Sequence, residues 1–148
     1  NMTVVYSKGF YQTCEKSDGG VLNGADNLFT ITGSPILVTE FVGIVTTVIG
    51  GIANCQIKLV VTEPAGTVNL STNVAIDSDA AGTSYIFTIA DPAVLTPTTA
   101  GALEVIPRIA WLCPIGTINA TCSAARTGNI KWYIGYYMLS QYSKVAAA

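Results

Sequence analysis

The sequence predicts an all-β, single-domain β-sandwich of the jelly-roll type with an extended N-terminal arm. Half of the 148 residues are hydrophobic and only 11% are charged, so the chain can bury one sizeable core. Short runs of β-branched residues alternate with turn sequences, as in sandwiches and barrels. No window shows an apolar period of 3.6, so we expect little helix.

The first 27 residues differ from the remainder. Their apolar pattern is too weak to define a core strand, so we expect residues 1–27 to form the arm and residues 28–148 to form the sandwich. An edge strand at residues 3–6 followed by a long loop is the alternative. No internal repeat or interior linker divides the chain into two domains.

The expected strands begin at residue 28. Phe29 and Ile31 alternate with their neighbours before a Gly33–Ser34–Pro35 turn. Gly43 interrupts a β-branched run, and we expect it to mark a bulge. Further strands are expected at residues 36–41, 43–49, 56–61, 68–76, 84–89, 109–113, 117–122 and 130–139.

The last of these runs is apolar on both faces. Alternation places Ile130, Trp132, Ile134, Tyr136 and Met138 on one face, and Lys131, Tyr133, Gly135, Tyr137 and Leu139 on the other. Such a strand is central in a packed core or lies against a neighbouring subunit. A ligand platform made of its aromatic side chains is the alternative.

Charge argues against one class of partner, and the length of the apolar runs argues against another. The net charge is −2 and the seven basic residues are scattered along the chain, whereas nucleic-acid binding needs clustered Lys and Arg. The most apolar stretch, residues 41–53, is shorter than the roughly 20 residues of a spanning helix. We therefore expect neither nucleic acid nor membrane as a partner.

Catalytic chemistry has little support in the residues. The chain contains no histidine, which removes the commonest general base and every Ser-His-Asp arrangement. Asp77 and Asp79 superficially suggest a calcium loop, but the remaining acidic ligands of an EF-hand are missing, so a turn with Asx hydrogen bonds is expected. No nucleotide-binding motif is present. We therefore expect no enzyme, and we assign no catalytic, cofactor-binding or metal-binding residue.

The four cysteines, Cys14, Cys55, Cys113 and Cys122, show no CxxC spacing. We expect buried thiols. A Cys113–Cys122 disulfide across neighbouring strands is the alternative for a protein that matures in an oxidising setting.

Three segments resemble a known group of proteins. They are LFTITGSPILVTEFVGIVTTVI at residues 28–49, CPIGTI at 113–118 and TGNIKWYIGYYML at 127–139. With the tail SKVAAA, they resemble tailed-bacteriophage virion structural proteins similar to capsid decoration (cement) proteins. The resemblance covers residues 28–148 in order, and residues 1–27 lie outside it.

The resemblance implies a homotrimer, assembled in the host cytoplasm, that binds the outer capsid surface and stabilises the shell by bridging major capsid subunits. Two other functions remain open. One is a phage tail or fibre component for host attachment, with Trp111, Tyr133 or Tyr137 exposed to a ligand. The other is a secreted carbohydrate-binding or adhesin module.

Overall fold

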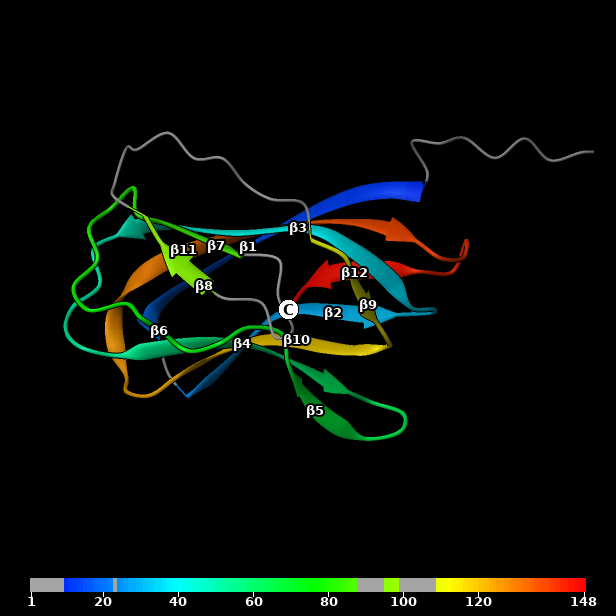
Figure 1. Ribbon diagram of the computed structural model, residues 1–148, viewed down its shortest axis with the longest axis horizontal. Coiled ribbons are helices and arrows are strands. Elements are labelled where there is room, and N and C mark those ends of the chain that lie inside the picture. Colours follow the sequence, from blue (N-terminus) through cyan, green and yellow to red (C-terminus); the bar gives the residue numbers. More distant parts are fainter. Residues whose placement is uncertain (1–9, 23, 88–94, 99–108) are drawn as a thin grey trace, which may run out of the picture.

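The computed structural model describes residues 10–22, 24–87, 95–98 and 109–148. These residues form two antiparallel sheets packed face to face, which confirms the predicted β-sandwich (Figure 1). This part of the chain contains no helix that is long and apolar enough to cross a membrane.

Among the described residues, each sheet contains six strands. The first sheet has the order β1 (Tyr11–Leu22), β11 (Arg126–Met138), β3 (Ile36–Thr47), β7 (Ser84–Phe87) and β8 (Leu95–Pro97), with β9 (Trp111–Cys113) also beside β3. The second sheet has the order β12 (Lys144–Ala147), β2 (Ala25–Thr32), β10 (Gly116–Cys122), β4 (Asn54–Val61) and β5 (Gly66–Asn69), with β6 (Val74–Ala75) also beside β4.

The pairing of these strands is that of a jelly roll. The first strands of the chain pair antiparallel with later strands in reverse order: β1 with β11, β2 with β10, β3 with β7, and β4 with β5. The chain changes sheet at each step from β1 to β4. A long antiparallel pairing rolled in this way into two sheets gives the double Greek key of the jelly roll, as predicted.

The structure places Tyr11–Leu22 in the sandwich, where an arm was predicted for residues 1–27. Strand β1 pairs with β11 over its whole length, from Tyr11 opposite Tyr137 to Leu22 opposite Arg126. It is an edge strand, and three of its side chains on the sandwich side, Gln12, Lys16 and Asp18, are polar. The period-2 apolar signal is therefore weak. The predicted boundary at 27/28 falls inside β2, and residues 1–9, with the alternative strand at 3–6, lie outside the described residues.

The structure also divides two other predicted regions differently. The runs 36–41 and 43–49 form one strand, β3, and the run 68–76 forms the separate strands β5 and β6. Gly43 marks no bulge, because it pairs directly with Trp132. The register of β3 and β11 instead shifts at Thr39 and at Thr46.

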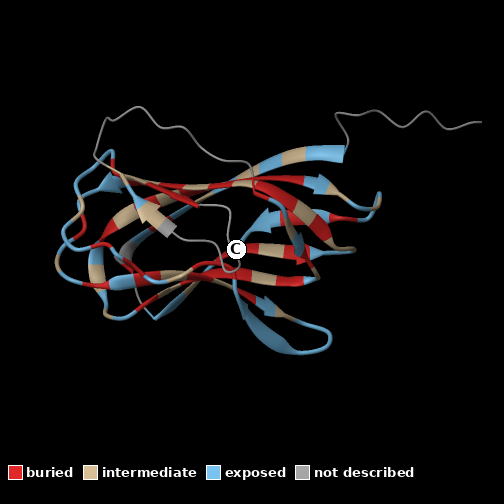
Figure 2. Ribbon diagram, in the orientation of Figure 1, coloured by how far each residue is buried: buried red, intermediate tan, exposed pale blue. Residues whose placement is uncertain are grey.

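The core lies between the sheets and is strongly aromatic. Buried positions line the inner side of both sheets in Figure 2. The ring of Phe41 lies 5.4 to 5.9 Å, centroid to centroid, from four other aromatic rings: Phe29, Phe87, Trp111 and Trp132. Four of the predicted inward residues of β11 are buried, Ile130, Trp132, Ile134 and Tyr136, so one face of this strand packs in the core as predicted.

Candidate functional site

The outer face of the first sheet carries exposed aromatic side chains. Tyr11 of β1 and Tyr133 and Tyr137 of β11 are each between 37% and 39% exposed. Val42 and Ile44 of β3 point to the same side and are half-buried. We call these five residues the tyrosine face. The outward side of an antiparallel sheet is usually polar, so an aromatic and aliphatic outward side needs a functional explanation.

Cross-strand register explains how this face is arranged. Tyr11 lies opposite Tyr137, and their ring centroids are 5.2 Å apart. Two residues further along β11, Gly135 lies between Thr13 of β1 and Glu40 of β3. The next outward residue is Tyr133. Gly135 therefore leaves a gap between two tyrosines on the same strand face.

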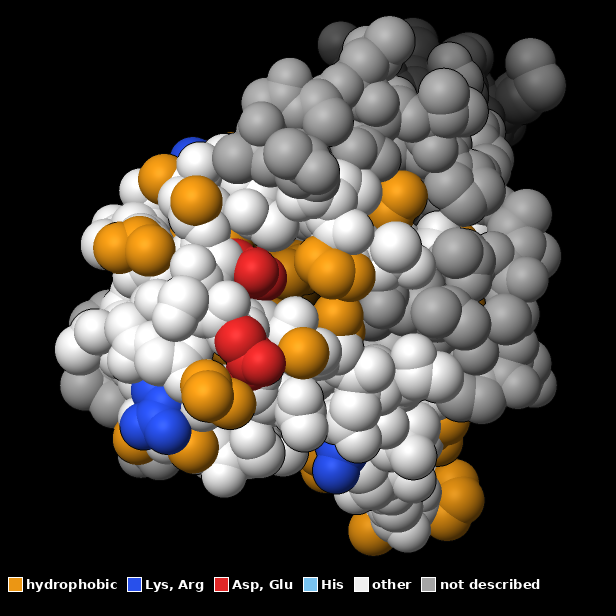
Figure 3. Space-filling view, turned by 60° about the vertical axis from the view of Figure 1, so that its left-hand side comes forward, with side chains coloured by type: hydrophobic (Ala, Val, Ile, Leu, Met, Phe, Trp, Pro, Cys, Tyr) orange, Lys and Arg blue, Asp and Glu red, His pale blue; other side chains and the backbone are white. Residues whose placement is uncertain are grey.

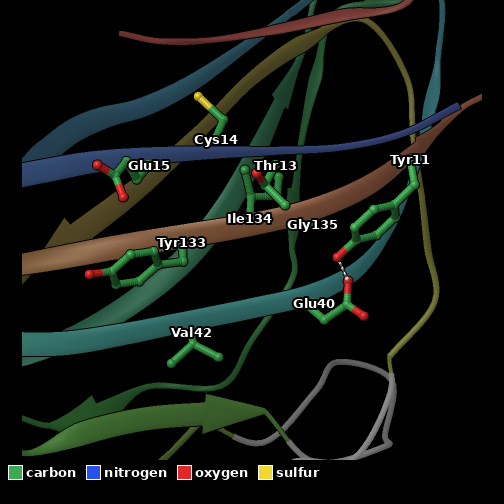
Figure 4. A pocket seen from close by; sticks show the side chains of 9 residues that line it. All are labelled: Tyr11, Thr13, Cys14, Glu15, Glu40, Val42, Tyr133, Ile134 and Gly135. Atoms are coloured by element: carbon green, nitrogen blue, oxygen red, sulfur yellow. Dashed lines mark hydrogen bonds between the residues drawn. The ribbon is translucent and has the colours of Figure 1, made fainter. Parts of the chain in front are cut away.

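This gap opens into a hollow of about 380 Å³. Figure 4 shows Tyr11 and Tyr133 on opposite sides of it, with Gly135 and Thr13 between them. Its lining residues are Tyr11, Thr13, Cys14, Glu15, Glu40, Val42, Tyr133, Ile134 and Gly135. The hollow thus combines two aromatic rings with two carboxylates.

Hydrogen bonds fix the carboxylate at the end of the hollow near Tyr11. Glu40 Oε2 accepts from the hydroxyl of Tyr11 at 2.8 Å and from that of Thr39 at 2.7 Å. A Cβ atom on Gly135 would collide with this carboxylate and with the Tyr11 hydroxyl. The glycine is therefore what allows the Tyr11–Glu40 bond to cross the face.

At the opposite end of the hollow, Lys131 forms an ion pair with Glu15. Its Nζ lies 3.2 Å from Glu15 Oε1 and 5.4 Å from the centroid of the Tyr133 ring. The hydrogen bond and negative charge of Glu15 raise the pKa of Lys131.

The described basic side chains form no patch on the face drawn in Figure 3. They lie apart from one another there, among uncharged side chains.

The three aromatic candidates from the sequence divide into two groups. Tyr133 and Tyr137 lie together on the tyrosine face, as the alternation of β11 predicted. Trp111 does not join them, because its ring packs 5.1 Å from Phe87 at the core. Sequence reasoning missed Tyr11 and Glu40, since their contact joins strands that are far apart in the chain.

Asp77 and Asp79 have structural contacts. Asp77 Oδ1 accepts from the backbone N–H of Ala53 at 3.0 Å, and Asp79 Oδ2 accepts from the hydroxyl of Tyr85 at 2.6 Å. Burial and the Asp79 carboxylate raise the pKa of Tyr85. Both aspartates thus tie their turn to other segments. Among the described residues, no three His, Cys, Asp or Glu side chains are grouped so as to hold a metal ion.

A second cluster of reactive groups lies inside the sandwich. Asp18 of β1 is only 7% exposed. Burial is the main cause that raises its pKa to about 7, and the charge and hydrogen bond of Asp26 act in the same direction. Asp18 is also close enough to the thiols of Cys55 and Cys122 to act on them electrostatically. Because Asp18 lies on an edge strand without an apolar pattern, the sequence did not reveal this cluster.

The cysteines are free thiols, and all except the half-buried Cys14 are buried. The alternative Cys113–Cys122 bridge assumed neighbouring strands, whereas β9 and β10 belong to different sheets. Cys122 instead lies directly opposite Cys55. Burial raises the pKa of Cys113 to about 12, so this thiol is a poor nucleophile.

Comparison with protein-family models and with curated proteins found no match. Two solved structures show a weak likeness. One is the infectious bursal disease virus Gt strain, with 15% identity, a TM-score of 0.24, and coverage of 91% of this chain and 39% of that chain. The other is a VP2 subviral particle of infectious bursal disease virus, with 14% identity, a TM-score of 0.26, and coverage of 92% and 38%. This chain thus spans about two fifths of the length of each. At these TM-scores the likeness carries no argument about function.

Proposed function

We propose that this protein is a capsid decoration (cement) protein of a tailed bacteriophage, which binds the outside of the capsid through the tyrosine face. The observation that carries the proposal is the exposure of Tyr11, Tyr133 and Tyr137 on an outward sheet face. Tyrosine is enriched at the centres of protein interfaces, where its ring provides contact area and its hydroxyl a hydrogen bond. The phrases at residues 28–49, 113–118 and 127–139 add the resemblance to phage decoration proteins.

The mechanism is stabilisation by mass action. A protein that binds the intact shell and not the ruptured one adds about 2.7 kcal/mol per site when its free concentration is 100 times Kd. A jelly roll suits this role because its two packed sheets form a stiff body, and no catalytic group is needed. As part of this proposal, the protein binds as a trimer that bridges neighbouring major capsid subunits.

Shells that lack the protein provide the test. Recombinant protein is added to expanded capsids, and bound protein is measured by co-sedimentation alongside the temperature at which the shell ruptures. We expect saturable binding and a higher rupture temperature. Failure of the protein to bind such shells would overturn the proposal.

Variants then locate the docking surface. Tyr137→Thr and Tyr133→Thr each remove an exposed ring from the tyrosine face, and we expect each to weaken shell binding at least tenfold, as for an interface hot spot. Tyr142→Thr is the matched control, since Tyr142 is 69% exposed and lies between β11 and β12. If all three variants bound the shell as tightly as the wild-type protein, the tyrosine face would not be part of the docking surface.

A further inference from the structure

Cys55 and Cys122 occupy opposite positions on neighbouring strands. Cys55 is the second residue of β4 and Cys122 the last residue of β10, and the two are direct partners in the antiparallel register. Both side chains point into the sandwich and are 1% and 6% exposed. The two sulfur atoms therefore lie on the same side of the second sheet.

The hydrogen bonds around this pair identify its type. The backbone N–H of Ser123 donates to the carbonyl of Asn54 at 2.9 Å, and these two residues are the next pair along the strands. The N–H of Cys122 donates away from β4, to the carbonyl of Gly24. Hydrogen-bonded and non-hydrogen-bonded pairs alternate along an antiparallel ladder, so Cys55 and Cys122 form a non-hydrogen-bonded pair.

That pair type has the geometry that a disulfide needs. Directly opposite residues in a non-hydrogen-bonded pair have Cα atoms about 4.5 Å apart and closely approaching side chains. Disulfides form across Cα separations of about 4.4 to 6.8 Å. The backbone of β4 and β10 therefore already holds the two cysteines at bridging distance.

We propose that Cys55 and Cys122 form a dithiol site that a small-molecule disulfide, such as oxidised glutathione, converts into an intramolecular disulfide joining β4 to β10. The Cys122 thiolate attacks one sulfur of the oxidant, and one glutathione thiolate leaves. The Cys55 thiolate then attacks the Cys122 sulfur of the mixed disulfide and displaces the second glutathione. Two protein thiols are oxidised, one glutathione disulfide is reduced to two thiols, and the two protons pass to the leaving thiolates.

The order of these two steps follows from the environment of each thiol. The hydrogen bond between the two side chains lowers the pKa of Cys122 and, with burial, raises that of Cys55. Cys122 is also the more exposed of the two. Since the thiolate is the nucleophile, Cys122 attacks first and Cys55 resolves the mixed disulfide.

The bridge would make the stability of the domain depend on its surroundings. In the reducing cytosol the pair stays as thiols, and in an oxidising medium it closes. Closing a long segment of chain between β4 and β10 restricts the unfolded state and so favours the folded one. This inference rests on the strand register and does not depend on the proposed function.

Wild-type protein is sufficient for the main test. The folded protein is equilibrated with oxidised and reduced glutathione at increasing ratios, trapped by alkylation, and mapped by mass spectrometry of unreduced peptides. We expect the loss of two of the four thiols, one cross-linked peptide pair that contains Cys55 and Cys122, recovery on reduction, and a higher denaturation midpoint for the oxidised form.

Other results would overturn the proposal. They are four alkylated thiols at the highest ratio, a cross-link that involves Cys14 or Cys113, or glutathione that remains attached to Cys122. The Cys113→Ser variant is the matched control and keeps the bridge. The Cys122→Ser variant loses it. Because the cross-link is read directly in the wild-type protein, poor folding of either variant leaves the result intact.

Discussion

The indole ring of Trp132 on β11 lies over Gly43 on β3, its direct partner in the register. A Cβ atom at residue 43 would be 2.5 Å from Cζ3 of the ring. Trp132 is fully buried and its Nε1–H has no acceptor among the described residues, so packing alone holds the ring. It lies between Phe41 and Tyr85, at centroid distances of 5.6 and 6.1 Å. The packing of Trp132 on Gly43 therefore lies within the aromatic part of the core.

The first prediction concerns this contact. Gly43→Ala adds a methyl group against a rigid buried ring, and we expect it to lower the free energy of unfolding by about 1–3 kcal/mol. Gly66→Ala is the control, because a Cβ at residue 66 would meet no atom within 4 Å, and its effect should stay within about 0.5 kcal/mol. Urea denaturation of both variants measures the difference. Equal stabilities would contradict the packing described here.

The second prediction concerns Asp18. Its pKa in the folded protein is raised from 3.8 to about 7, so the folded state holds a proton that the unfolded state releases. The stabilisation is fully present below pH 3.8 and is lost as the pH rises toward 7. One proton contributes a fall of at most about 1.4 kcal/mol per pH unit.

Asp18→Asn should remove this part of the pH dependence, because the amide does not titrate. Asp77→Asn is the control, since it retains an oxygen that can accept from Ala53 and should leave the slope unchanged. The measurement is urea denaturation at several pH values between 4 and 7. If the free energy of unfolding of Asp18→Asn falls with pH as steeply as that of the wild-type protein, the pH dependence comes from another group.

The third prediction concerns the hollow. Gly135→Ala would place a methyl group in the hollow and displace the ends of two flexible side chains, Glu40 and Tyr11. We expect a loss of about 1 kcal/mol or less in stability, together with weaker shell binding. Tyr11→Phe removes only the hydroxyl that donates to Glu40, and so separates that bond from the shape of the hollow. Unchanged shell binding by Gly135→Ala would show that the hollow takes no part in docking.

Much of the fold could be predicted from local pattern, and the pairing that makes the sites could not. The alternation of residues 130–139 correctly placed Tyr133, Gly135 and Tyr137 on one face. It could not show that Tyr11 would lie beside them, because β1 has polar side chains toward the core. Likewise, the β-branched residues around Gly43 predicted a strand, but the reason for the glycine is Trp132, which lies far along the chain.

The cysteines show the same limit. Cys113 and Cys122 are near in sequence, yet they lie in different sheets, and Cys122 faces Cys55 through strand pairing. Such a pairing is nonlocal, and spacing alone does not determine it.

The fourth prediction concerns assembly. A bridging decoration protein that acts as a trimer should have three times the mass of the chain in solution. Light scattering at micromolar concentration measures this mass directly. A clean monomer would contradict the trimer.

The most direct test of the central claim is the copy number of this protein in purified virions, measured by quantitative mass spectrometry against the major capsid protein. A protein that covers the shell should approach one copy per major capsid subunit, and this is the ratio we expect. A few copies per particle would contradict decoration and place the protein at the tail or a vertex, and its absence from virions would contradict a virion role altogether.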